Sequence, residues 1–160
     1  MKTLFLVRHG KSSWRHHELK DEERPLLVKG EKKTKIVAEK LLKKNVEIDL
    51  IICSHAIRAT ETAKIIAAVL KYPGSKIKIE KSIYNADADA LYHPLFDLSE
   101  DINSVMLVGH NPGMTYFANK LLNSNIDNVP TSGLIAVSFN IDNWHDVINA
   151  KAKELFKIFP

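Results

Sequence analysis

Cysteine is almost missing from this chain: Cys53 is the only one among 160 residues. A single thiol excludes an intramolecular disulfide, and proteins without a disulfide framework are typical of the reducing cytoplasm. We therefore expect a cytoplasmic protein. Because Cys53 closes the apolar run 50–52, we interpret it as a buried structural thiol rather than a nucleophile.

Long apolar runs are missing as well. The first one covers only residues 4–7, too short for the core of a signal peptide. No stretch approaches the roughly 18 apolar residues that a membrane helix needs. We therefore expect no membrane partner.

Nucleic-acid signals and metal-ligand spacings are also lacking. The formal net charge is +4, but the basic residues are spread thinly, and no arginine stripe with interleaved aromatics occurs. The cluster His16-His17-Glu18 has no second ligand pair at metal-site spacing, which favours an ordinary surface loop. We expect no nucleic-acid partner, no metal and no cofactor; the oligomeric state is left open.

The patterning that is present predicts one α/β domain over residues 1–160, with 45% hydrophobic residues. Strands are expected at residues 4–7, 50–53, 76–80, 105–108 and 134–139, with a last edge strand within 152–159. Helices are expected at about 30–44, 54–71 and 88–98, and after Asn111 as N-cap with Pro112 in the first helical position. The first of these helices has Ile36, Val37, Leu41 and Leu42 on its expected apolar face. Strands that alternate with helices predict a three-layer α/β/α sandwich around a mostly parallel sheet of five to six strands.

Three of these strands end in residues that suit anion chemistry. The first runs into Arg8-His9-Gly10, the second into Ser54-His55 with Arg58 behind, and the fourth into Gly109-His110-Asn111. Ligands of open α/β sheets bind just beyond the carboxyl ends of the strands. Two arginines and up to three histidines would therefore surround one crevice.

This set of groups favours a phosphate. Arg8 and Arg58 can each grip two oxygens and stay charged at any working pH. Neutral imidazole is a nucleophile, and cations beside it keep it neutral, so His9 is the expected phosphoryl acceptor. His110 would bind the transferred oxygen as a charged donor, shuttle protons, or both, and His55 is interpreted as a supporting or loop-facing residue rather than a second nucleophile. Singly, each residue has an ordinary structural explanation; their joint occurrence favours a site.

The combination resembles the histidine phosphatase superfamily, and within it the short SixA-like phosphohistidine phosphatases. The similarity rests on Arg8-His9-Gly10-Lys11-Ser12, on Arg24-Pro25-Leu26 followed by Gly30, on residues 54–63 and on residues 108–113. It implies a phosphoglycerate mutase-like fold and a phosphohistidine intermediate at His9. It also implies a phosphate pocket of Arg8, Arg58 and His110, with a weaker contact from Ser12.

Two departures bear on the substrate. Larger mutase and sugar-phosphatase relatives carry a glutamate after the third strand as proton donor, whereas residues 84–87 hold none; Asp87 or Asp89 could substitute. The chain also lacks the long insertions that close over small sugar phosphates. Because imidazole, with a conjugate-acid pKa of about 6.5, leaves more readily than an alkoxide, both departures favour phosphohistidine on a protein.

Two rival functions are kept. One is a small-molecule phosphomonoesterase or mutase of the same superfamily, with a small phosphoester as substrate. The other is a non-catalytic module that binds a phosphorylated ligand. Trp14, Tyr92 and Trp144 could line a docking surface, although partial burial is the expectation we favour for such large apolar residues.

Overall fold

The structure is a computed structural model that describes residues 1–160. Six strands form one sheet: β1 (Lys2–Arg8), β2 (Leu50–Cys53), β3 (Lys78–Ile79), β4 (Ser104–Gly109), β5 (Leu134–Phe139) and β6 (Ala152–Ile158). The α-helices are α1 (Val28–Leu42), α2 (Ile57–Leu70), α3 (His93–Phe96) and α4 (Gly113–Leu122). Short 3-10 helices lie at Asp21–Glu23, Gly74–Lys76, Lys81–Ile83, Ala90–Tyr92 and Trp144–Asn149.

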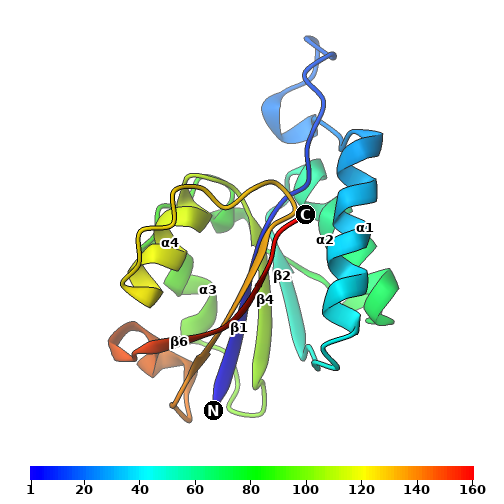
Figure 1. The fold of residues 1–160 in the computed structure, drawn as a ribbon. Coiled ribbons are helices and arrows are strands. Elements are labelled where there is room, and N and C mark those ends of the chain that lie inside the picture. The colour runs from blue at the N-terminus through cyan, green and yellow to red at the C-terminus, as the bar shows by residue number, and fades with distance from the viewer.

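The sheet has the order β3-β2-β4-β1-β5-β6, with β1 and β4 at its centre. Strands β1 to β4 run parallel, and β5 pairs antiparallel with β1 and with β6. Figure 1 shows α1 and α2 on one face of the sheet and α3 and α4 on the other. The predicted three-layer α/β/α sandwich with a mostly parallel sheet is therefore confirmed.

Alternation along β1 builds a core on each face of the sheet. Leu4 and Leu6 join the apolar cluster under α3 and α4, whereas Phe5 and Val7 join the cluster under α1 and α2. All four side chains are buried, as a strand covered on both faces requires. None of the helices combines the length and the apolar character that a membrane-spanning segment requires.

Several local expectations need correction. The third strand is only two residues long. The helix after Asn111 begins at Gly113, so Pro112 is the cap residue and not the first helical one. On α1, Ile36 and Leu42 are exposed instead of facing the core. There Thr34 and Ala38 are buried together with Val37 and Leu41, which the spacing of apolar residues predicts on the inner face.

The large aromatic residues also differ from the expectation of partial burial. Tyr92 and Trp144 are buried in the cluster under α3 and α4, where the Trp144 indole N–H donates to the Ile102 carbonyl at 2.7 Å. Trp14 is 73% exposed, in the polar segment that follows β1. In Figure 1 this segment, coloured blue, projects beyond the edge of the sheet at which β1 ends.

The start of α1 is fixed against the segment that follows β1. The Leu27 N–H donates to the Lys11 carbonyl at 2.8 Å. At Gly30 a Cβ atom would lie 2.3 Å from the same carbonyl oxygen, so only glycine allows the two backbones to approach this closely. The first turn of α1 is thereby held beside the carboxyl end of β1.

We predict that Gly30→Ala lowers the free energy of unfolding by about 1–3 kcal/mol, because overpacking here displaces backbone rather than a flexible side chain. An alanine in a helix interior would otherwise stabilise by up to about 1 kcal/mol. The matched control is Gly74→Ala, where nothing lies within 4 Å of the added carbon. Urea unfolding measures both, and equal stabilities of the two variants would contradict the close approach.

Candidate active site

Parallel pairing brings the ends of three strands to one place. Arg8 of β1 lies opposite Gly109 of β4, and the His9 N–H donates to the Gly109 carbonyl at 3.0 Å. On the other side of β4, the Ser54 N–H that follows β2 donates to the Val108 carbonyl at 3.1 Å. The imidazoles of His9 and His110 consequently lie side by side, with ring centroids 5.1 Å apart.

The environment of His9 determines its tautomer. Its Nδ1 lies 2.7 Å from the Gly10 carbonyl oxygen. Because a carbonyl can only accept, Nδ1 carries the proton and Nε2 presents a lone pair. Nε2 accepts a long hydrogen bond from Nε of Arg58 at 3.4 Å. Burial lowers the pKa of His9 to about 4, with further lowering by the charges of Arg58 and Arg8 against the effect of the Gly10 bond, so the ring is neutral at pH 7.

Asp21 holds the guanidinium of Arg58, in the first turn of α2. Nη1 of Arg58 donates to the Asp21 carbonyl at 2.7 Å, and Nη2 donates to the Asp21 carboxylate at 2.9 Å. The Tyr84 hydroxyl donates to the same carboxylate. Burial would raise the pKa of Asp21, but the hydrogen bonds from Tyr84 and Arg58 outweigh it and hold the pKa at about 2. Arg58 is therefore fixed with Nε toward His9.

Arg8 is held from a different loop. Its Nη1 donates to the Val129 carbonyl at 2.9 Å, while its buried Nε has no partner among the protein atoms. The hydroxyl of Thr115 accepts from the Val129 N–H at 3.0 Å and donates to the side-chain oxygen of Asn111 at 2.9 Å. Burial lowers the pKa of Arg8 from its ordinary value. Residues of α4 thus support the loop that orients this guanidinium.

His110 contacts the serine at the end of β2. Its Nε2 lies 2.7 Å from Oγ of Ser54, which also accepts from the Ala56 N–H at 3.2 Å. The serine hydroxyl retains both a lone pair and a proton for this contact, so the hydrogen bond fits either tautomer of the His110 ring. The other ring nitrogen, Nδ1, is buried and has no partner among the protein atoms. Burial lowers the pKa of His110 to about 3, with further lowering by the neighbouring His9 and Arg58. The ring is therefore neutral at pH 7 and is not the charged donor that the sequence suggests.

A cavity of about 420 Å³ lies at this edge of the sheet. All five residues that the sequence suggests for a phosphate pocket line it: Arg8, His9, Ser12, Arg58 and His110. Lys11, Trp14, Arg24, Asn111 and Thr131 complete the wall. Four full cations and no carboxylate face this space, which is the composition of an anion site. His55 is absent from the wall; its ring packs against Tyr84 instead, with centroids 5.1 Å apart.

The segment after β1 contributes Trp14, Asp21 and Arg24, none of which the sequence reasoning assigned to the phosphate pocket. Arg24 is buried, and its guanidinium carbon lies 3.4 Å from the centroid of the exposed Trp14 ring. Nε of Arg24 donates to the Asp21 carboxylate at 3.1 Å. The spacing Asp21-x-x-Arg24 was the available signal, but it stands in a loop without periodicity and carries no structural information by itself.

The two candidate proton donors lie in different places. Asp87 lines a second cavity of about 240 Å³, which shares His110 and Asn111 with the larger one. Asp89 instead forms a salt bridge with Lys120 of α4 and lines neither cavity. No group of three or more histidine, cysteine, aspartate or glutamate side chains lies close enough together to hold a metal ion.

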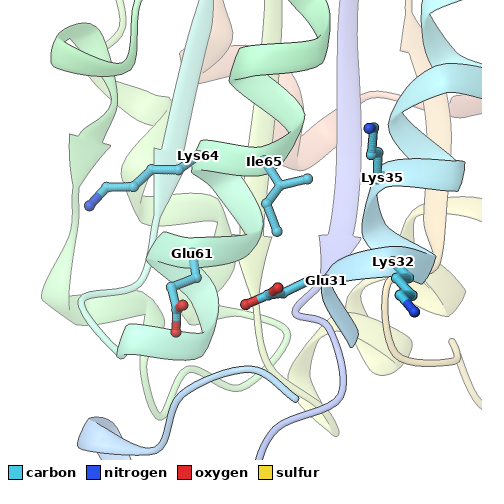
Figure 2. Close-up of a pocket in the computed structure, with 6 residues that line it drawn as sticks. All are labelled: Glu31, Lys32, Lys35, Glu61, Lys64 and Ile65. Atoms are coloured by element: carbon cyan, nitrogen blue, oxygen red, sulfur yellow. The ribbon is translucent and has the colours of Figure 1, made fainter. Parts of the chain in front are cut away.

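Another cavity, of about 460 Å³, lies between α1 and α2. It is lined almost entirely by charged side chains, and Figure 2 shows Glu31 of α1 extending toward Glu61 of α2. Glu61 accepts from the Leu26 N–H at 3.2 Å, which ties α2 to the segment that precedes α1. Lysines and glutamates alternate around this groove, so it lacks the uniform positive charge of the cavity at His9.

Comparison with known proteins agrees with this arrangement. The sequence profile of the histidine phosphatase superfamily (branch 1) matches residues 4–91. The chain belongs to this superfamily, as its motifs predict. An uncharacterized chloroplastic protein of Arabidopsis thaliana is 28% identical over 151 residues, covering 89% of this chain and 69% of that protein. An uncharacterized Picosynechococcus protein is 40% identical over 65 residues, which span only 39% of its length.

Solved structures that share this fold include SixA-type proteins. A SixA-type protein from Agrobacterium tumefaciens superimposes with a TM-score of 0.82 at 25% identity, covering 99% of this chain and 98% of that one. A protein histidine phosphatase SixA complexed with tungstate gives a TM-score of 0.83 at 22% identity, covering 99% and 97% of the two chains. The chain is SixA-like, which confirms the resemblance given by its motifs.

We predict that both imidazoles titrate far below the ordinary histidine range. NMR titration of the ring nitrogens should find His9 neutral at pH 7, with a midpoint near pH 4. Arg58→Ala should raise that midpoint, because it removes a positive charge beside Nε2. A midpoint above pH 6 for His9 or His110 in the wild-type protein would contradict the described environment.

The same shifts make stability depend on pH. A histidine whose pKa falls on folding binds fewer protons in the native state than in the unfolded state. The contribution of such a histidine to the free energy of unfolding is complete above its unfolded-state pKa of about 6.5. This contribution is lost as the pH falls through the folded-state pKa. The free energy of unfolding should therefore decrease from pH 6.5 to pH 4, and less steeply in His9→Gln.

Proposed function

We propose that this protein is a cytoplasmic phosphatase that hydrolyses phosphohistidine on a signalling or phosphorelay protein, through a covalent intermediate at His9. The observation that carries the proposal is the neutral His9 ring, whose Nε2 lone pair lies in a cavity together with the half-buried Arg8 and the buried Arg58. Membership of the superfamily supports the reaction class. The fold shared with a protein histidine phosphatase supports the substrate class.

In the first step, Nε2 of His9 attacks the phosphorus of the substrate. The N–P bond of the substrate phosphohistidine breaks as the new N–P bond to His9 forms, and the leaving imidazole takes a proton. In the second step, water attacks the phosphorus of phospho-His9, which releases inorganic phosphate and restores the neutral ring. The Gly10 carbonyl keeps the proton on Nδ1, so the same lone pair is available in every cycle.

The cations stabilise the charge on the transferred group. A phosphoryl group in transfer spreads negative charge over three equatorial oxygens, and fixed donors aimed at them supply most of the catalysis. We assign this role to Nε of Arg58, to Arg8 and to His110, with a further contact from Ser12. Because these side chains supply the positive charge that a metal ion would otherwise supply, we propose a metal-independent reaction.

The proton donor to the leaving group is assigned to Asp87. It lines the smaller cavity that adjoins His110, whereas Asp89 is engaged with Lys120 on the surface. Imidazole is a far better leaving group than an alkoxide, so a weakly placed acid is sufficient for phosphohistidine. This difference in leaving groups is why we favour the protein substrate over a sugar phosphate.

We predict that an activated aryl phosphate labels the protein at His9. Rapid quenching followed by peptide mapping should place the label on Nε2, and His9→Ala should give neither label nor turnover. Arg58→Ala should reduce turnover by at least about a hundredfold, because it removes a donor to the transferred group. Label on another residue, or full turnover in either variant, would refute the mechanism.

The second candidate is a small-molecule phosphomonoesterase or mutase. It is favoured by the position of Asp87 beside His110, where a carboxylic acid could protonate an alkoxide. A mycobacterial glucosyl-3-phosphoglycerate phosphatase shares the fold, with a TM-score of 0.68 at 13% identity, covering 96% of this chain and 97% of that one.

A substrate panel run in the presence of a chelator separates the candidates. We expect turnover of phosphoramidate and of a phosphohistidine peptide to exceed that of sugar phosphates and phosphoglycerate, with no loss on addition of chelator. The opposite preference would establish the second candidate. Tight phosphate binding without turnover of any substrate would establish a non-catalytic binding module.

A further inference from the structure

Three lysines stand together at the mouth of the cavity that contains His9. Lys11 lines the cavity, and Lys29 and Lys33 follow on the first two turns of α1. The Leu27–Lys11 hydrogen bond and the contact of Gly30 with the Lys11 backbone fix the start of α1 there. We call Lys11, Lys29 and Lys33 the lysine rim; all three residues are exposed.

The lysine rim is unfavourable for the isolated protein. Lys29 and Lys33 are like charges at positions i and i+4 of a helix, which repel each other. Lys29 also stands in the first turn of α1, where the helix dipole favours acidic residues. None of the three lysines forms a salt bridge within the protein. The positive charge of Lys29 is the main cause that lowers the pKa of Lys11, because the two ammonium groups repel each other.

A partner that brings negative charge would reduce the repulsion among these three lysines. We propose that the lysine rim is a docking surface for an acidic segment flanking the phosphohistidine of the protein substrate, and this inference rests on the proposed function. The cavity holds the phosphoryl group, while carboxylates beside it meet the lysines. Complementary charge of this kind accelerates encounter and sets partner choice more than it adds affinity.

An acidic protein segment fits better than a nucleic acid. The rim consists of lysines without interleaved arginines, and the aromatic ring in the cavity wall, Trp14, is already in contact with the Arg24 guanidinium on one face. Base stacking on aromatic platforms is the usual second component of single-strand binding, and a single ring does not provide it. Carboxylates need only compact positive charges, which the three ammonium groups supply.

The test compares charge reversal at the rim with the same reversal at the opposite end of α1, in its last turn and at its C-cap residue. The rim variant is Lys29→Glu with Lys33→Glu, and the matched control is Lys40→Glu with Lys43→Glu. Both doubles change the net charge equally, but the control positions are exposed and about 16 Å farther along the helix. That distance exceeds the Debye length of about 8 Å at 0.15 M salt. None of the four lysines is in the proposed catalytic machinery.

The substrates are two phosphohistidine peptides, one with glutamates and one with glutamines around the phosphorylated residue. We expect wild type and control to prefer the acidic peptide by about tenfold in kcat/KM at low salt, and high salt to reduce the preference. The rim variant should lose it while keeping kcat on an aryl phosphate. Equal kcat/KM on the two peptides in wild type, or the same loss in both doubles, would overturn the proposal.

A second measurement separates this inference from the proposed function. The unphosphorylated acidic peptide should inhibit aryl phosphate turnover competitively in wild type and about tenfold more weakly in the rim variant. Inhibition of this pattern without hydrolysis of either phosphohistidine peptide would preserve the docking surface and refute the proposed substrate. A short single-stranded DNA that inhibits more strongly than the acidic peptide, through the same lysines, would refute the acidic-segment assignment.

Discussion

The register between β1 and β4 is the constraint on which the site depends. Arg8 stands opposite Gly109 only because every residue from Thr3 onward is paired in step with its partner on β4. Leu4 and Leu6 fill one core while Phe5 and Val7 fill the other, so a shift by one residue would misplace all four side chains. Packing on two faces thereby fixes the positions of the two imidazoles.

The polar groups at the sheet edge form a second layer of constraint. Carbonyl oxygens of Gly10 and Val129 and the carboxylate of Asp21 hold His9, Arg8 and Arg58 respectively. In each of these three side chains one nitrogen keeps no partner or only a weak one: Nε of Arg8 has none, and Nε of Arg58 and Nε2 of His9 share one long hydrogen bond. Buried donors without partners are costly in a folded protein, and such costs are concentrated where a ligand supplies the missing partner. The site is therefore preorganised by groups outside the set that would touch a phosphate.

Much of this organisation could be predicted from the sequence. Continuous apolar runs of four residues mark β1, β2 and β4 clearly, because central strands are buried on both faces. Parallel strands joined by helices share one carboxyl edge, and that rule alone places Arg8, Arg58 and His110 together. The convergence follows from topology, so it could be inferred without knowledge of any side-chain geometry.

The rest could not be predicted, for physical reasons that differ from case to case. Asp21 and Tyr84 lie 63 positions apart in two irregular segments, and no periodicity links them. Helical spacing of apolar residues predicts Ile36 and Leu42 on the inner face of α1, but both are exposed. Thr34 and Ala38 are buried there instead. The burial of Trp144 depends on the Ile102 carbonyl that receives its indole proton, a partner 42 positions away.

The placement of the two tryptophans gives the molecule two independent optical reporters. Trp14 stands in solvent at the wall of the cavity, in contact with the Arg24 guanidinium, so its emission is red-shifted and sensitive to events at that mouth. Trp144 is fully buried in the cluster under α3 and α4, so its emission should lie at the shorter wavelengths of an indole in apolar surroundings. Intrinsic fluorescence can thus follow ligand arrival and loss of the interior as separate signals, without any label.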